Sequence, residues 1–140
     1  MLVTICLVIA IADGDTLTAR CGEPGAYQQV KVRLAEIDAP ERSQPYGQRS
    51  RQSLGALCHQ QQASIQSAGL DRYGRTIAHV ACAGTDASAH QVATGMAWHY
   101  LKYSSSPTLA AAQAQAQAKK IGLWADLDPV PPWAYRHAKR

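Results

Sequence analysis

Apolar residues dominate the start of the chain and end at a turn signal. The apolar stretch over residues 1–12 runs into Asp13-Gly14, which is typical of a hairpin turn. We therefore expect a buried first strand in which Leu7, Ile9 and Ile11 alternate, although the residues between them are also apolar. The stretch is shorter than the ~20 apolar residues that a membrane-spanning helix needs. It also lacks the basic leading segment and the cleavage site of a signal peptide.

Alternation continues after the turn. A second strand is expected over residues 16–20, and a cleaner period of two places Val30, Val32 and Leu34 on one face of a third strand. Arg33 should point to the opposite face, away from the core. Proline ends this strand in the segment at 38–41, since it cannot donate to a ladder and restricts the residue before it.

The next segments predict one helix between further strands. Leu54 and Leu57 stand at helical spacing in the segment from 48 to 58. Short strands are expected at 63–67 and at 76–82, and the turn Asp71-Arg72-Tyr73-Gly74-Arg75 precedes the second of them.

The second half of the chain predicts helices. Asp86 or Ser88 can cap a short helix that ends near Gly95, and a longer helix is expected over 107–120, with proline at its start. Residues 125–140, rich in proline and tryptophan, are expected to form an irregular strap. Strands followed by helices indicate an α+β fold around a small, closed or nearly closed barrel. The whole chain, 1–140, is expected to be a single domain.

Composition changes this picture only slightly. Hydrophobic residues make up 46% of the chain and charged residues 17%, so the chain is expected to fold and not to be disordered. The formal net charge of +4 is compatible with a polyanionic partner such as nucleic acid, but it is also common in proteins without one.

The four cysteines lack the Cys-x-x-Cys spacing of zinc sites. Cys6 and Cys21 are equidistant from a turn centred between Asp13 and Gly14, so they should face each other across a hairpin at a distance that suits a disulfide. Such a bond would stabilise the fold by roughly 3 kcal/mol in the chain-entropy model. Cys58 and Cys82 would then pair by elimination, and the protein would be secreted or periplasmic. The alternative is four buried free thiols in a reducing cytoplasm.

Two acidic clusters lie in separate segments. Asp13 and Asp15 flank a glycine in the first turn, and Asp38 and Glu41 stand three apart at the end of a strand. Hard divalent cations bind several oxygen ligands, and two carboxylates with a carbonyl are a normal calcium set. Each cluster alone is also typical of an ordinary turn or strand exit.

Two arginines add to the two carboxylate clusters. Arg33 precedes Asp38 by five residues, and Arg75 opens a strand after a tight turn. A guanidinium group complements the charge that develops on phosphate oxygens during phosphodiester hydrolysis. The plainer alternatives are a surface ion pair for Arg33 and a solvated turn residue for Arg75.

Several segments together resemble the staphylococcal nuclease (thermonuclease) family. They occur in the family's order from residue 9 to residue 124: IADGDTL at 11–17, VRLAEIDAPE at 32–41, QPYGQRS at 44–50, DRYGRTIAHV at 71–80 and QVATGMAWHYLKY at 91–103. The resemblance implies a five-stranded OB-type β-barrel with three helices. It also implies a calcium-dependent endonuclease that cleaves DNA and RNA with little sequence preference and leaves 3′-phosphates.

The resemblance also implies residue roles. Calcium would be held by Asp15, Asp38 and the backbone carbonyl of Ala39, and Glu41 would position or deprotonate the attacking water. Ala39 replaces the threonine of the family archetype, but its ligand is main-chain. The loop between Glu41 and Tyr46 is shorter than in the archetype and lacks its lysines, so the resemblance does not define how the substrate enters the site.

The remaining roles concern the substrate. The resemblance implies that Arg33 and Arg75 bind the scissile phosphate, that Tyr73 contacts a terminal phosphate, and that Tyr103 and Tyr100 meet a base. Stacking on an aromatic ring is indifferent to base identity. The alternative for these tyrosines is packing at the barrel edge. The histidines share no spacing that predicts a site.

A rival hypothesis is a noncatalytic OB-fold module that binds nucleic acid. Its mark would be the loss of Glu41, Arg33 or Arg75, and all three are present. A zinc-stabilised structural domain is disfavoured by the cysteine spacing. In the catalytic reading the partners are DNA and RNA, with no membrane, and the protein is expected to be a monomer.

Overall fold

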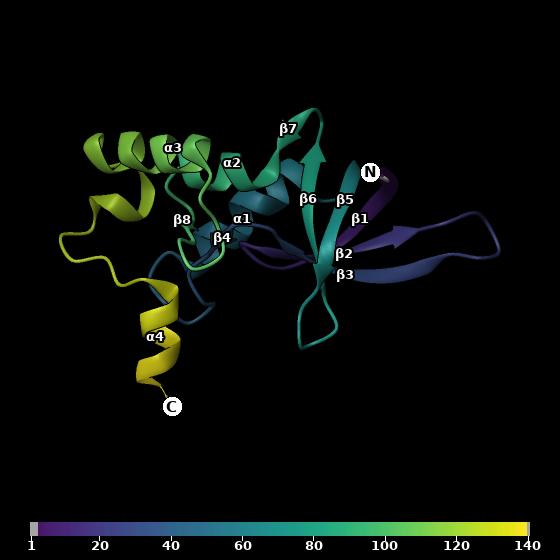
Figure 1. Cartoon of the computed structure of the whole chain (residues 1–140), viewed down its shortest axis with the longest axis horizontal. Coiled ribbons are helices and arrows are strands. Elements are labelled where there is room, and N and C mark those ends of the chain that lie inside the picture. Colours follow the sequence, from purple (N-terminus) through teal and green to yellow (C-terminus); the bar gives the residue numbers. More distant parts are fainter. Residues whose placement is uncertain (1–2, 140) are drawn as a thin grey trace.

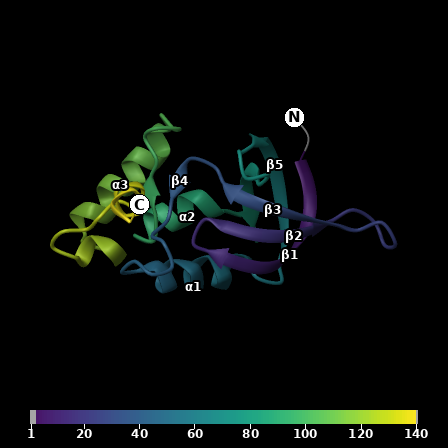
Figure 2. The same cartoon turned by 90° about the horizontal axis from the view of Figure 1, so that it is seen from below.

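The barrel is built from five strands that close on themselves. The computed structural model describes residues 3–139, and the barrel strands are β1 (Val3–Asp13), β2 (Thr16–Cys21), β3 (Gln28–Leu34), β5 (Gln62–Leu70) and β6 (Thr76–Cys82). Their order is β3-β2-β1-β5-β6, and a parallel pairing of β3 with β6 closes the ring. Figure 2 shows β1, β2 and β3 side by side, with α1 beside β1. This confirms the expected α+β barrel.

Helices cover one end of the barrel. Figure 1 shows the barrel strands on one side of the molecule and the helices on the other. The helices are α1 (Gly47–Cys58), α2 (Ala87–Ala93), α3 (Pro107–Ala118), the 3-10 turn η1 (Gly122–Ala125) and α4 (Pro132–Ala138). The short strands are β4 (Ile37–Asp38), β7 (Thr85–Asp86) and β8 (Trp98–His99). Within residues 3–139 no helix is long and apolar enough to cross a membrane.

The fourth helix, α4, was not expected from the sequence. Pro132 opens it at a first helical position, where a missing N–H does no harm. The prediction of an irregular strap took the prolines only as breakers, and it was wrong for this part of the tail. The other helix predictions are confirmed: Asp86 caps α2 by accepting from the Ala89 N–H, and Ser106 caps α3 in front of Pro107.

The first strand is less buried than the sequence suggested. Its buried side chains are Cys6 and Val8, whereas Ile5 is 59% exposed. Leu7 and Ile9 are therefore not on the core face, because a run with apolar residues at every position does not define a face. Ile11, beyond the bulge after Val8, does pack against the core. The third strand follows its prediction: Val32 and Leu34 are buried.

The β1–β2 hairpin turns one residue later than expected. Asp13 pairs with Thr16, so Gly14 and Asp15 form the turn. Two bulges in β1 then add two residues to that strand, and farther from the turn Leu7 pairs with Arg20. The expected pairing of Cys6 with Cys21 results all the same.

Both expected disulfides are formed. Cys6 joins Cys21 with 4.6 Å between their Cα atoms, and Cys58 joins Cys82 with 5.3 Å. The first bond lies within a hairpin. The second links the last residue of α1 to the last residue of β6, so it fastens a helix to the barrel.

Removing the helix-to-barrel bond should destabilise the protein. We expect the double substitution Cys58→Ala with Cys82→Ala to lower the free energy of unfolding by about 3 kcal/mol, because the bond closes a loop of 24 residues in the unfolded chain. Guanidinium chloride denaturation measures this difference. Cys6→Ala with Cys21→Ala is the matched control for a bond within one hairpin. Equal free energies of unfolding for the double variant and for the wild type with its disulfides intact would contradict a stabilising role of this bond.

Candidate active site

The turn between β1 and β2 presents a buried carboxylate. Asp15 Oδ1 accepts a hydrogen bond of 2.9 Å from the Thr16 hydroxyl, and Oδ2 accepts one of 2.8 Å from the Ala39 N–H. The Asp15 carbonyl accepts from the Leu34 N–H at 2.8 Å, which ties the turn to β3. The side chain is thus fixed before any ligand is bound.

A buried glutamine holds the turn from behind. The Gln91 side-chain amide of α2 donates to the Gly14 carbonyl at 2.8 Å and to the Ser50 carbonyl at 3.0 Å. Gln91 is fully buried, so these bonds satisfy a polar group that would otherwise be costly in the core. Sequence reasoning gave this residue no role, although it begins the segment QVATG that carries part of the resemblance.

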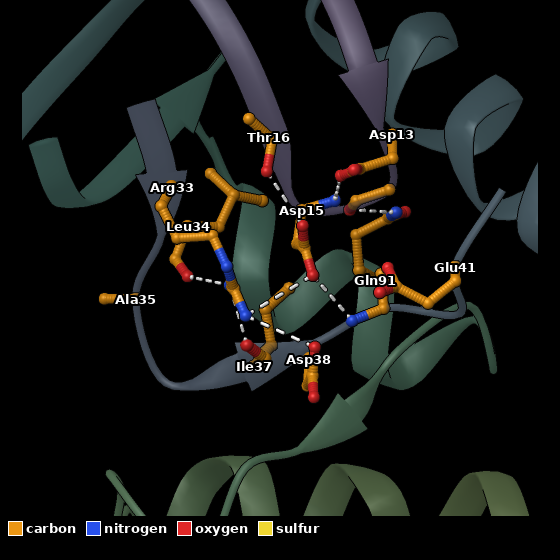
Figure 3. A network of polar contacts seen from close by, with 12 residues as sticks. Asp13, Asp15, Thr16, Arg33, Leu34, Ala35, Ile37, Asp38, Glu41 and Gln91 are labelled. Atoms are coloured by element: carbon orange, nitrogen blue, oxygen red, sulfur yellow. Dashed lines mark hydrogen bonds and ion pairs between the residues drawn. The ribbon is translucent and has the colours of Figure 1, made fainter. Parts of the chain in front are cut away.

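Arg33 joins the two acidic clusters. Its Nη1 donates to the carbonyls of Leu34 and Ile37, each at 2.8 Å. Its Nη2 lies 3.5 Å from Asp15 Oδ2 and 3.3 Å from Asp38 Oδ1. Figure 3 shows the guanidinium group pointing between the two carboxylates. The strand parity was correct, but the group is largely covered and faces carboxylates instead of solvent.

Asp38 and Glu41 follow from one short segment. Asp38 ends β4, which pairs with β8, and it is completely buried. Glu41 lies beyond Pro40, and about a third of its side chain is exposed. Gly47 is needed beside it, because a Cβ there would collide with the Glu41 carbonyl.

Arg136 is a site residue that the sequence did not reveal. From α4 it donates to Asp38 with both terminal nitrogens, at 3.0 Å to Oδ1 and 2.7 Å to Oδ2. Its Nη1 also lies 3.7 Å from Glu41 Oε1. It comes from the segment expected to be an irregular strap, and no local pattern connects it to a residue 98 positions earlier.

Burial and neighbouring groups shift the pKa values of the first acidic cluster in opposite directions. Burial and the neighbouring Asp15 raise the pKa of Asp13 to about 7. Burial also acts to raise the pKa of Asp15, but Arg33 and three hydrogen bonds outweigh it and hold that pKa below its ordinary value.

Both carboxyl groups of the second acidic cluster have raised pKa values. Burial raises the pKa of Asp38 despite the hydrogen bonds from Arg136, and burial likewise raises the pKa of Glu41. The hydrogen bonds to Asp38 in turn raise the pKa of Arg136, which therefore stays charged. A carboxylate with a raised pKa is a stronger base when it is ionised, which suits Glu41 to accept a proton.

Arg75 lies apart from this network. Its Nε donates to Asp71 at 2.7 Å, within the turn that the sequence predicted. In the parallel register Arg33 is opposite Ile77, and Arg75 lies just before β6, two residues earlier. The structure thus brings Asp15, Arg33, Asp38, Ala39 and Glu41 together and leaves Arg75 engaged with Asp71.

The three tyrosines occupy different surroundings. Tyr73 is 66% exposed beside Arg75, whose guanidinium carbon lies 5.5 Å from the ring centroid. Tyr103 is similarly exposed and meets Tyr100 edge to face. Tyr100 stacks on Trp133, with 5.2 Å between the centroids and 3° between the planes, so one face of its ring is covered.

The ligand types fit a hard divalent cation. Within residues 3–139 no three side chains of histidine, cysteine, aspartate or glutamate form a metal cluster. The set implied by the resemblance is smaller, with two carboxylates and one carbonyl. Asp15 and Asp38 both lie within 3.5 Å of one guanidinium nitrogen, and the Ala39 N–H bonds to Asp15. The two carboxylates therefore converge closely enough to share one positive group, and oxygen ligands that converge in this way suit a hard cation.

Comparison with known proteins shows which family and which proteins the chain is similar to. The model of the family described as "Staphylococcal nuclease homologue" matches residues 31–126. An "Uncharacterized endonuclease" of Haemophilus influenzae is 46% identical over 135 residues, covering 96% of this chain and 74% of the relative. A "Micrococcal nuclease" of Shigella flexneri is 37% identical over 145 residues, covering 95% of this chain and 80% of the relative.

The fold agrees with these matches, since the five strands close into the barrel that the resemblance implied. The match to the family model covers most of the chain, including Arg33, Asp38, Glu41 and Arg75. The chain belongs to the staphylococcal nuclease family.

Proposed function

We propose that this protein is an endonuclease that hydrolyses phosphodiester bonds of DNA and RNA and requires calcium. The observation that carries the proposal is the grouping of Asp15, Arg33, Asp38 and Glu41 at one end of the barrel (Figure 3). The matches to relatives named as nucleases support the same reading.

Calcium would be held by Asp15, Asp38 and the Ala39 carbonyl. When bound, it would supply positive charge to the phosphate oxygens on which negative charge develops. The chain's own residues would supply the other functions. Because Asp15 and the Ala39 peptide are fixed by hydrogen bonds, little reordering would be needed to present their oxygens.

Glu41 would act as the general base. It would take a proton from a water molecule as that water attacks phosphorus, and the bond from phosphorus to the 5′ oxygen would break. The products would be a 3′-phosphate and a 5′-hydroxyl, whose proton comes from solvent. The raised pKa of Glu41, caused chiefly by burial, strengthens it as a base.

Arg33 and Arg75 would stabilise the pentacoordinate phosphate. Arg33 is held by two carbonyls, so its guanidinium group is preorganised. Arg75 would have to exchange its ion pair with Asp71 for the phosphate. Tyr73 would contact a terminal phosphate, and Tyr103 with Tyr100 would offer ring faces to a base.

The two disulfides support an oxidising compartment. We propose that the protein works outside the cell or in a periplasm, where such bonds persist. It is proposed to act as a monomer, which sedimentation analysis would test.

Calcium dependence is the first test. We expect the protein to cut single- and double-stranded DNA and RNA in calcium and to lose this activity in chelator, because the buried carboxylates would then lack their cation. A gel assay with calcium, magnesium and chelator lanes measures it. Binding of nucleic acid in calcium without cutting would favour the noncatalytic module instead.

Replacing the proposed base should remove turnover and spare binding. Glu41→Gln is expected to lower kcat by about 10²- to 10⁴-fold, which is the usual contribution of a positioned base. Single-turnover cleavage and substrate titration separate the two effects. Glu23→Gln, at an exposed glutamate of the β2–β3 loop, is the matched control. An unchanged kcat for Glu41→Gln would refute the role.

Replacing Arg75 tests whether it leaves Asp71 for the substrate. Arg75→Ala is expected to lower kcat by about 10²- to 10³-fold, as the loss of one oxyanion donor does. Arg20→Ala, at an exposed arginine that lies over the Tyr27 ring, is the control and should leave kcat unchanged. An unchanged kcat for Arg75→Ala would mean that Arg75 does not leave Asp71 for the substrate.

A further inference from the structure

Asp38 already has a cationic partner delivered from the far end of the chain. Arg136 contacts both of its oxygens, at 3.0 Å and 2.7 Å, and approaches Glu41 as well. A fork of two parallel N–H bonds on one carboxylate is the strongest ordinary geometry for such a pair. No step of the proposed reaction assigns a role to Arg136.

The contact is built by α4 and is not an accident of a loose tail. Pro132 is buried, Trp133 stacks on Tyr100, and Trp133 also meets Trp98 edge to face. The Tyr135 hydroxyl lies 2.7 Å from the Ser43 hydroxyl. These contacts fix α4 so that Arg136 points at Asp38.

The lone pairs of Asp38 are largely taken. Oδ1 accepts from both Arg33 and Arg136, and Oδ2 accepts from Arg136. A carboxylate offers about four acceptor positions, so little remains for a metal ion. A guanidinium group at contact distance would also repel a doubly charged cation.

The acidic cluster explains why such a partner is useful. Arg33 approaches Asp15 and Asp38, and Arg136 approaches Asp38 and Glu41. Without a metal ion and without Arg136, Arg33 alone would balance the two buried carboxylates. Arg136 adds a second positive charge at the most deeply buried of them.

We propose that Arg136 is a resident counter-ion that competes with the divalent cation for Asp38, and that it leaves Asp38 when the cation binds. This rests on the proposed function, since it requires a cation site at Asp15 and Asp38.

Arg136 can leave Asp38 without a movement of α4. Its side chain is 35% exposed, so the guanidinium group can turn toward solvent while α4 keeps its place at the edge of the molecule, as Figure 1 shows it.

Calcium affinity tests the competition. Isothermal titration of the metal-free full chain would compare the wild type with Arg136→Gln, Arg136→Lys and Arg20→Gln. We expect Arg136→Gln to bind calcium about tenfold more tightly, a change of about 1.4 kcal/mol. Arg136→Lys should be intermediate, because lysine keeps the charge but loses the fork. Arg20, which lies over the Tyr27 ring, is the control and should change nothing.

Thermal melting supplies a second measurement with a distinct signature. In chelator, Arg136→Gln should melt below the wild type, because the buried Asp38 then loses the two hydrogen bonds from Arg136. In saturating calcium the gap should close. A purely structural arginine would leave the same gap in both conditions.

The outcomes separate this inference from the proposed function. Calcium binding by the wild type with equal or weaker binding by Arg136→Gln overturns the competition and leaves the metal site standing. Calcium binding by Arg136→Gln but not by the wild type supports the competition. No binding by either protein overturns the metal site and this inference together. If Arg136→Gln does not fold, Arg136→Lys decides in the same way.

Discussion

Two buried carboxylates share one guanidinium group, and the active end of the barrel is arranged around that contact. Asp15 comes from the first hairpin turn, Asp38 from a two-residue strand, and Arg33 from the strand between them. Removing buried charges from water is costly unless they are paired and hydrogen-bonded. Here the Ala39 N–H donates a further hydrogen bond to Asp15. The buried Gln91 donates to the Gly14 carbonyl and so holds the turn that carries Asp15.

The sequence predicted the barrel well where alternation was clean and poorly where it was not. The strand with Val32 and Leu34 has one apolar face, so the outward direction of Arg33 followed. The first strand is apolar throughout, so Leu7 and Ile9 were assigned to the wrong face, whereas the bulge after Val8 brings Ile11 to the core side. The Cys6–Cys21 pair was expected from a turn placed one residue early, and the two bulges compensated for that error.

The parts of the site that the sequence missed are those brought in by tertiary packing. Gln91 and Arg136 act on residues that lie 77 and 98 positions away, and no local spacing marks them. The helix that carries Arg136 follows two prolines and begins with a third, and prolines indicate a break as readily as a helix start. A charged residue near the end of a chain has no predictable partner until the fold is known.

The central claim is that Asp15 and Asp38 form one cation site around which phosphate chemistry is organised. Calcium titration of the wild type beside Asp15→Asn tests it most directly, since the amide keeps the shape of the side chain and removes its charge. The account predicts one calcium ion per wild-type chain and a loss of that binding in Asp15→Asn. Undiminished calcium binding by Asp15→Asn would contradict it.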